Sequence, residues 1–126
     1  MCRLIEGDIR DATALDALFS THQIDAVMHF AALAYVGESV SVPGCYYDVN
    51  VHGTRVLLHA MVRARVWSIV FPSSCAVYGE PNCIAIVEGM QLDPINPYGF
   101  TKVVCERMMD DFERAYGLRS ARLRYF

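Results

Sequence analysis

Short apolar runs alternate with longer segments of helical pattern along the chain, and this alternation limits the possible folds more than any other feature. Four runs have the length and apolar character of buried strands, and they occupy residues 3–6, 25–30, 67–72 and 118–126. Helices are predicted between them over residues 11–21, 43–65 and 97–116. This alternation is typical of an α/β domain with a parallel sheet. We therefore predict a single domain of this class over residues 1–126.

The predicted helix ends carry residues that favour those positions. Asp11 is a suitable N-cap for the first helix, and Asn96 followed by Pro97 suits the start of the third. Gly117 suits its end. Loops are expected over residues 31–37 and 75–94, and the second is rich in Gly, Pro and Asn. Loops of this kind often carry functional residues.

Three residues near the second loop suggest an oxidation site for a hydroxyl group. Tyr98 and Lys102 are four residues apart, so they share one helix face, and a cation beside a phenol favours the phenolate, which is a base. Ser74 ends a predicted strand and could orient the reacting hydroxyl by a hydrogen bond. The alternatives are a core tyrosine near a solvated lysine, and a serine that bonds the backbone. Ligands bind at the carboxyl ends of parallel strands, which favours the functional interpretation.

Other candidates have two interpretations that the sequence does not separate. The small residues after Phe30 could let a flat cofactor lie against the backbone, or they could reflect ordinary packing. Asp8 could hydrogen-bond an adenine or end a strand. Asn50, if buried, needs hydrogen-bond partners for its side-chain amide. It would find them either by tying strand ends together or by contacting a cofactor.

Composition excludes several functional classes. A net charge of −3 with mixed signs gives no reason to expect nucleic acid or an anionic membrane as partner. The apolar runs are too short to span a bilayer, and no secretory signal is recognisable, so the cytoplasm is the expected compartment. The five cysteines include no C-x-x-C pair and the four histidines form no recognisable cluster, so no metal site is predicted.

These segments together resemble the extended short-chain dehydrogenase/reductase superfamily (its NAD-dependent epimerase/dehydratase family), and within it the UDP-glucose 4-epimerases. Segment 29–40 is the most specific match, and segments 46–54, 73–81 and 96–102 match further family motifs. The resemblance implies a partial Rossmann-like, doubly wound parallel sheet that binds NAD. None of the eight glycines forms G-x-x-G-x-x-G or G-x-G-x-x-G, so we expect the first βαβ unit and the C-terminal substrate domain to be missing, as in a chain truncated at both ends.

The resemblance also implies a reaction, the interconversion of UDP-glucose and UDP-galactose in galactose metabolism by reversible oxidation at C4 with bound NAD. Tyr98 would act as the base, Lys102 would favour its phenolate and hold the nicotinamide ribose, and Ser74 would orient the sugar hydroxyl. Further cofactor contacts are implied at Asp8, Ile9, Phe30, Ala31, Ala32, Leu33, Ala34, Asn50 and Phe126.

Three alternatives stay open at this point. The chain also resembles epimerases of UDP-pentoses and of other nucleotide sugars. It resembles 4,6-dehydratases less, because Cys75 and Ala76 stand where those enzymes carry an acidic pair. It could also be a non-catalytic remnant, and we expect no turnover from the 126 residues alone. The family is commonly homodimeric. The resemblance implies that the dimer interface would include the helices over residues 43–65 and 97–116.

Overall fold

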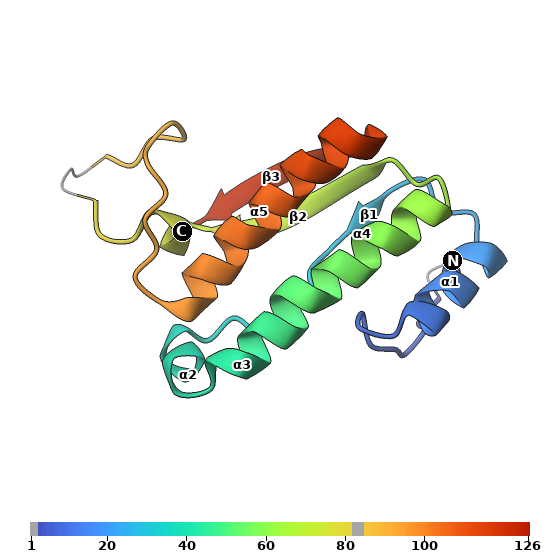
Figure 1. Cartoon of the computed structure of the whole chain (residues 1–126), viewed down its shortest axis with the longest axis horizontal. Coiled ribbons are helices and arrows are strands. Elements are labelled where there is room, and N and C mark those ends of the chain that lie inside the picture. The colour runs from blue at the N-terminus through green and yellow to red at the C-terminus, as the bar shows by residue number, and fades with distance from the viewer. Residues whose placement is uncertain (1–2, 82–84) are drawn as a thin grey trace.

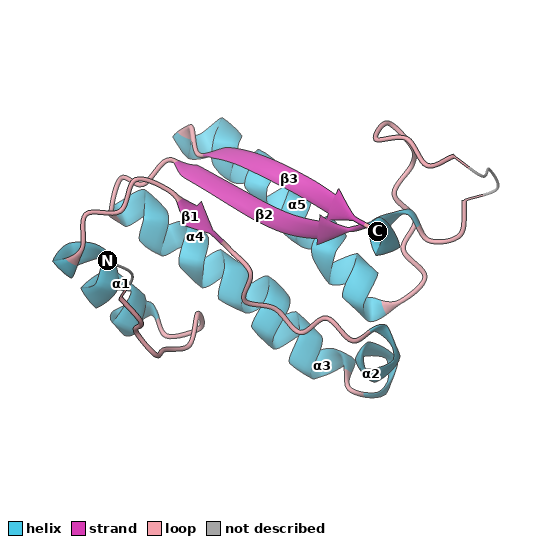
Figure 2. Ribbon diagram, turned by 180° about the vertical axis from the view of Figure 1, so that it is seen from behind, coloured by secondary structure: helices cyan, strands magenta, loops and turns pink. Residues whose placement is uncertain are grey.

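The computed structural model describes residues 3–81 and 85–126, and they form a parallel sheet with helices on one face (Figure 1). Seen from behind, the strands lie in front of α4 and α5, so these two helices cover the same face (Figure 2). In the described residues the sheet has three strands in the order β1–β2–β3. The elements are α1 (Ala12–Thr21), β1 (Val27–Met28), α2 (Val36–Ser41), α3 (Pro43–Tyr46), the π-helix η1 (Tyr47–His52), α4 (Gly53–Arg63), β2 (Ser68–Ser74), the 3₁₀-helix η2 (Cys75–Tyr78), α5 (Pro97–Tyr116) and β3 (Arg119–Tyr125).

The core lies between β2 and the helices α4 and α5. Burial alternates along β2, where Ile69, Phe71 and Ser73 are buried, because successive strand residues point to opposite faces. On the other face, Leu123 and Tyr125 of β3 are 42% and 51% exposed. The core cluster consists of Leu57, Leu58, Met61, Val66, Ile69, Phe71, Cys105, Met109 and Leu118.

The parallel register brings the carboxyl ends of the strands to one edge of the sheet. β2 and β3 are paired from Ser68 with Arg119 to Ser74 with Tyr125. β1 pairs with β2 only at Val27–Ile69 and Met28–Val70, followed by a bond from His29 N–H to the Val70 carbonyl. Pro72 lacks the N–H that would continue this ladder two residues later. The chain after β1 therefore leaves the sheet early and runs on to α2 (Figure 2).

The prediction of a strand at residues 3–6 is wrong. The segment has no regular structure and is exposed throughout. A strand needs a neighbour to pair its N–H and C=O groups, and the described sheet ends at β1 without one for this segment. The strand predicted at residues 25–30 is present but shorter than predicted, since β1 covers only Val27–Met28. The loop predicted at residues 31–37 ends earlier than predicted, because α2 begins at Val36.

The predicted helices are confirmed. The Asp11 carboxylate accepts a hydrogen bond from Ala14 N–H at the start of α1. Asn96 caps α5 in the same way, and Gly117 ends it in the left-handed conformation, with φ 77°. The long helix predicted over residues 43–65 is present as α3, η1 and α4 in succession. In the loop predicted over residues 75–94, η2 forms the first turn, and residues 82–84 lie outside the described residues.

Within the described residues, no helix combines the length and apolar character that crossing a bilayer requires.

Candidate active site

The first two turns of α5 bring Tyr98 and Lys102 to the carboxyl edge of β2. Lys102 is only 4% exposed, and its Nζ donates a hydrogen bond to the Pro72 carbonyl at 2.9 Å. The same Nζ lies 5.7 Å from the centroid of the Tyr98 ring and 4.8 Å from that of Phe71. The Lys102 ammonium therefore lies near the Tyr98 ring and is buried rather than solvated, while its effect on the phenol stays a prediction.

The Lys102 ammonium is poorly solvated. Burial lowers its pKa, and the nearby Cys105 thiol opposes this effect. An ammonium has three N–H donors, and the Pro72 carbonyl is its one hydrogen-bond acceptor among the described residues. Two donors therefore remain for a ligand, and a negative charge beside Nζ would be strongly stabilised in this dry position.

Ser74 lies at the end of β2 and caps the 3₁₀ turn that follows. Its Oγ accepts a hydrogen bond from Ala76 N–H at 3.2 Å, so the backbone-bonding alternative describes part of its role. Its own O–H has no acceptor in the described part of the chain and can be given to a ligand.

Gly99 allows α5 to approach this turn closely. A Cβ on Gly99 would lie 2.5 Å from the carbonyl oxygen of Ala76. Only glycine therefore lets the first turn of α5, which carries Tyr98, pack directly against the turn that follows Ser74.

Asn50 connects the chain after β1 to α5. It is 2% exposed and lies in the π-helix η1. Its Oδ1 accepts from Leu33 N–H at 2.8 Å, and its Nδ2 donates to the Leu33 carbonyl at 2.9 Å and to Thr101 Oγ1 at 3.1 Å. Thr101 in turn donates to the Tyr98 carbonyl at 2.7 Å. Asn50 thus joins a loop to a helix rather than strand ends to each other, as one interpretation had it, and a cofactor contact stays a prediction.

The segment after β1 presents small and exposed side chains at the same edge. Phe30 is 62% exposed, Ala31 and Ala34 are exposed, and Ala32 is half-buried. Phe126 follows Tyr125, the partner of Ser74, and is 89% exposed. Most of these predicted cofactor positions are therefore accessible to a ligand, and their roles toward a cofactor stay predictions.

Asp8 and Ile9 lie elsewhere, against the start of α4. Arg10 Nη2 bonds the Asp8 carboxylate at 2.6 Å, and its Nη1 bonds Asp48 at 2.6 Å. The bonds from Arg10 hold the pKa of Asp8 at about 2. Ile9 packs over Gly53, where a Cβ would lie 2.6 Å from Ile9 Cδ1. Their roles toward a cofactor stay predictions.

Three functional candidates were missed by sequence reasoning. Ser73, which precedes Ser74, donates to Glu106 Oε1, and Arg124 bonds the same carboxylate through two nitrogens at 3.0 and 2.6 Å. Glu106 lies four residues after Lys102, so the i, i+4 spacing was an available signal. A cavity of about 720 Å³ lies beside Arg124, but Tyr98, Lys102 and Ser74 do not line it.

Comparisons with known proteins agree with this architecture. A family model described as "GDP-mannose 4,6 dehydratase" matches residues 1–126. The UDP-glucose 4-epimerase of Rhizobium meliloti is 47% identical over 123 residues, which make up 98% of this chain and 38% of that protein. A protein of Arabidopsis thaliana named "Probable UDP-arabinose 4-epimerase 3" is 45% identical over 98% of this chain and 30% of its own length. The chain thus spans only about a third of the length of these relatives.

A solved structure gives the same result at the level of the fold. The UDP-glucose 4-epimerase from Brucella ovis, in complex with NAD, superposes with a TM-score of 0.95 at 50% identity. The match covers 97% of this chain and 38% of the Brucella protein.

Proposed function

Because the chain belongs to the family described by the GDP-mannose 4,6-dehydratase model, we propose that it forms the sugar-oxidising part of an NAD-dependent nucleotide-sugar 4-epimerase. The substrate pair that we propose is UDP-glucose and UDP-galactose, as in the Rhizobium relative, with a place in galactose metabolism. The observation that carries the proposal is the buried Lys102 ammonium beside Tyr98 at the carboxyl edge of the sheet.

In the proposed mechanism, each of the three side chains has one task. The Tyr98 phenolate removes the proton from the 4-hydroxyl, and the Ser74 hydroxyl holds that oxygen in line for the transfer. The Lys102 ammonium, whose Nζ is buried 5.7 Å from the centroid of the Tyr98 ring, would attract the negative charge that develops on the phenol oxygen. When the ketone is reduced on its other face, Tyr98 returns the proton and the 4-hydroxyl is inverted.

The residues present fit the nicotinamide end of NAD, which supplies the acceptor for the hydride leaving C4. Lys102 has two N–H donors left for ribose oxygens, and the small residues Ala31, Ala32 and Ala34 leave room for a flat ring near the backbone. The sequence contains no glycine-rich turn to cradle a pyrophosphate, so we assign no residue to that part of the cofactor.

A second candidate is a 4-epimerase of UDP-pentoses. It is favoured by the 45% identity to the Arabidopsis protein, which covers 98% of this chain. The side chains proposed to act at C4 would be the same, since neither sugar requires a different base. As a further partner we propose a second copy of the chain, through the helices α3–α4 and α5.

The test is a graft of this chain into the Rhizobium meliloti epimerase in place of its matching segment. We expect the graft to convert UDP-galactose to UDP-glucose, and Tyr98→Phe to lower the rate about 100-fold or more because the base is lost. Tyr116→Phe is the matched control, since it removes an exposed hydroxyl from the same helix. UDP-arabinose is assayed in parallel, and because the host supplies the rest of the enzyme, a change in the ratio of the two rates relative to the host epimerase measures what this chain contributes to the choice between the two candidates.

Two outcomes would contradict the proposal. A folded graft that binds NAD and converts neither sugar would refute the function. A graft in which Tyr98→Phe keeps full activity would refute the mechanism.

A further inference from the structure

The face of α5 that carries Tyr98 and Lys102 continues with Glu106, one turn later. Glu106 is 3% exposed, and its carboxylate accepts hydrogen bonds from two different strands. Ser73 Oγ of β2 bonds Oε1 at 2.5 Å, and Arg124 of β3 bonds Oε1 and Oε2 at 3.0 and 2.6 Å. A single side chain thus joins α5 to the residue preceding Ser74.

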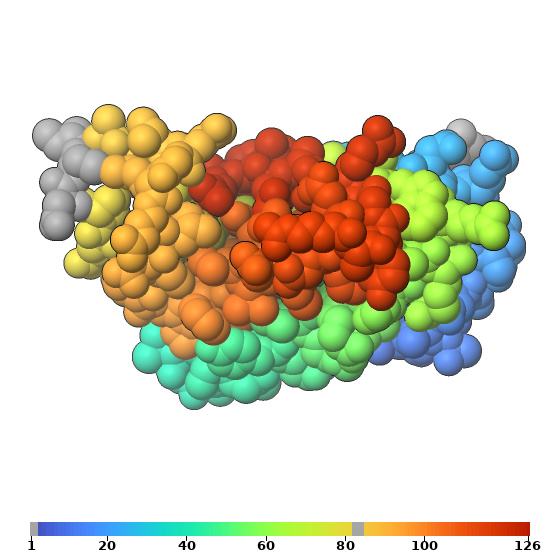
Figure 3. Space-filling model, turned by 45° about the horizontal axis from the view of Figure 1, so that its top comes forward, coloured from blue at the N-terminus to red at the C-terminus, as the bar shows by residue number. Residues whose placement is uncertain are grey.

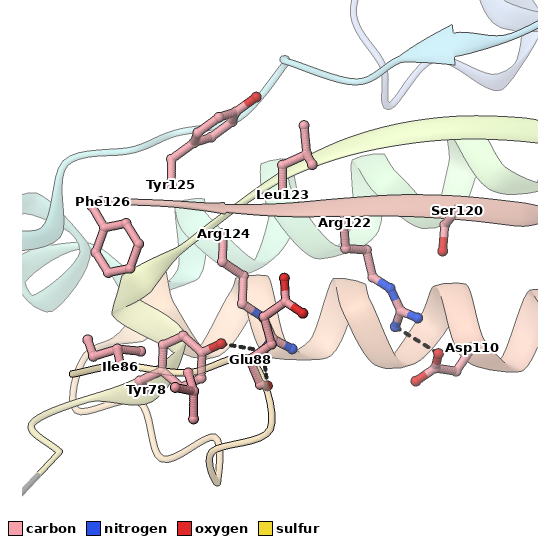
Figure 4. A pocket seen from close by; sticks show the side chains of 11 residues that line it. Tyr78, Ile86, Glu88, Asp110, Ser120, Arg122, Leu123, Arg124, Tyr125 and Phe126 are labelled. Atoms are coloured by element: carbon pink, nitrogen blue, oxygen red, sulfur yellow. Dashed lines mark hydrogen bonds and ion pairs between the residues drawn. The ribbon is translucent and has the colours of Figure 1, made fainter. Parts of the chain in front are cut away.

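Arg124 extends this network into the loop between Ser74 and Tyr98. Its Nη1 donates to the Tyr78 hydroxyl at 2.6 Å and to the Glu88 carbonyl at 3.0 Å (Figure 4). Its guanidinium also lies 5.0 Å from the centroid of the Tyr78 ring. In the space-filling view, this loop and the first turns of α5 form one end of the molecule (Figure 3). The loop is therefore held at two points by the same guanidinium that binds Glu106.

Stability alone is a weak explanation for such a network. Burial by itself would raise the pKa of Glu106, and the hydrogen bonds from Arg124 and Ser73 outweigh burial and lower it. The attraction thus offsets the desolvation of both groups, and an apolar pair of similar volume would often stabilise a protein equally well. A carboxylate with three hydrogen bonds is held in one orientation, and so are the groups bonded to it. An apolar pair would not fix the orientation of its neighbours in this way.

We propose that Glu106 is a positioning residue for the epimerase site, fixing Ser74 against Tyr98 through Ser73 and holding the connecting loop through Arg124. The inference rests on the proposed function. Ser73 and Ser74 are adjacent, so a bond that fixes the Ser73 side chain also fixes the backbone from which the Ser74 hydroxyl projects. Lys102 and Glu106 are one turn apart, so the same bond fixes how far α5 lies from β2.

The neighbouring ion pair offers a matched control. Asp110, one turn beyond Glu106, bonds Arg122 of β3 at 2.7 Å and thus also joins α5 to β3 (Figure 4). Arg122 Nη1 also donates to the Glu106 backbone carbonyl at 3.2 Å, but among the described residues no hydrogen bond joins the Asp110 or Arg122 side chain to Ser73 or to the loop. Asp110→Asn therefore removes a charge and a bridge from the same helix and leaves in place the three bonds of the Glu106 carboxylate to Ser73 and Arg124.

The experiment compares Glu106→Gln with Asp110→Asn in the graft into the Rhizobium meliloti epimerase. We expect Glu106→Gln to lower kcat tenfold to about 100-fold, the cost of a misplaced reacting group, with KM for UDP-galactose changed less than twofold. Asp110→Asn should change neither value more than twofold. Equal effects of the two variants on kcat, with an active parent graft, would overturn the inference. A parent graft that folds and binds NAD but converts neither sugar would instead refute the proposed function.

Hydrogen exchange on the chain itself gives a readout that is independent of activity. In Glu106→Gln we expect the amides of Ala76 and Gly79 to exchange at least tenfold faster, while those of Leu57 and Leu58 in α4 change less than twofold. A purely stabilising role would accelerate all four amides alike and would contradict the inference.

Discussion

The close approach of α5 to the turn after Ser74 can be tested by adding one methyl group. In Gly99→Ala the new Cβ would lie 2.5 Å from the Ala76 carbonyl oxygen and 3.1 Å from both the Ala76 carbonyl carbon and Pro94 Cβ. Two of these atoms are backbone, so they cannot move aside by a rotamer change. The methyl group must push the first turn of α5 away from η2, and with it Tyr98.

The magnitude follows from a comparison with other helical glycines. Gly44 in α3 has no atom within 4 Å of an added Cβ, so Gly44→Ala should stabilise the fold by about 0.5–1 kcal/mol through helix propensity. Gly99→Ala gains a similar term but adds overpacking, which typically costs about 1–3 kcal/mol. We therefore expect it to be less stable than Gly44→Ala by about 1–3 kcal/mol. In Gly53→Ala the new Cβ meets only side-chain atoms, of Ile9 and Arg10, so its stability should fall between those of the other two variants.

Urea unfolding of the three variants, followed by the fluorescence of Trp67, measures this order from the midpoints at constant m-value. If Gly99→Ala unfolds at the same urea concentration as Gly44→Ala, the close packing of α5 on η2 is refuted. In the graft, Gly99→Ala should also lose activity that Gly44→Ala keeps.

Three smaller effects follow from other contacts. Asn50→Ala leaves both polar backbone groups of Leu33 unpaired and should destabilise the chain by about 1–3 kcal/mol in urea unfolding. Asp11→Ala removes the N-cap of α1 and should cost about 1 kcal/mol in the same assay. The pKa of Glu106 is lowered on folding, so its contribution to stability is present above the ordinary value of 4.5 and is lost as the pH falls below it. The melting temperature of the wild type should therefore fall more steeply below pH 4.5 than that of Glu106→Gln.

The helices could be predicted from the sequence because their signals are local. The cap at Asn96, the proline at position 97 and the stop at Gly117 all act within a few residues, and α5 has the predicted bounds. A strand depends instead on a partner distant in sequence, so residues 3–6, which have strand character but no neighbour, could not be judged locally. The π-helix around Asn50 had no sequence signal.

The same distinction applies to the candidate site. Tyr98 and Lys102 could be paired from the sequence because residues at i and i+4 always share a helix face. The hydrogen-bond acceptor of Lys102 could not be predicted in this way, since the Pro72 carbonyl belongs to another element. The link from Ser73 to Arg124 depends on their pairing in register across two strands, which the sequence does not specify.

The direction of α5 relative to the strands explains why Tyr98 precedes Lys102 rather than following it. In a parallel sheet the connecting helix runs antiparallel to the strands, so the N-terminus of α5 meets the carboxyl end of β2 (Figure 1). The helix N-terminus carries partial positive charge, which favours a phenolate in the first turn. A lysine in that turn would be disfavoured, whereas one turn deeper its long side chain still reaches the edge while its charge stays buried. In the proposed mechanism, this order lets the partial charge of the helix N-terminus and the ammonium both attract the negative charge that Tyr98 would carry as the base.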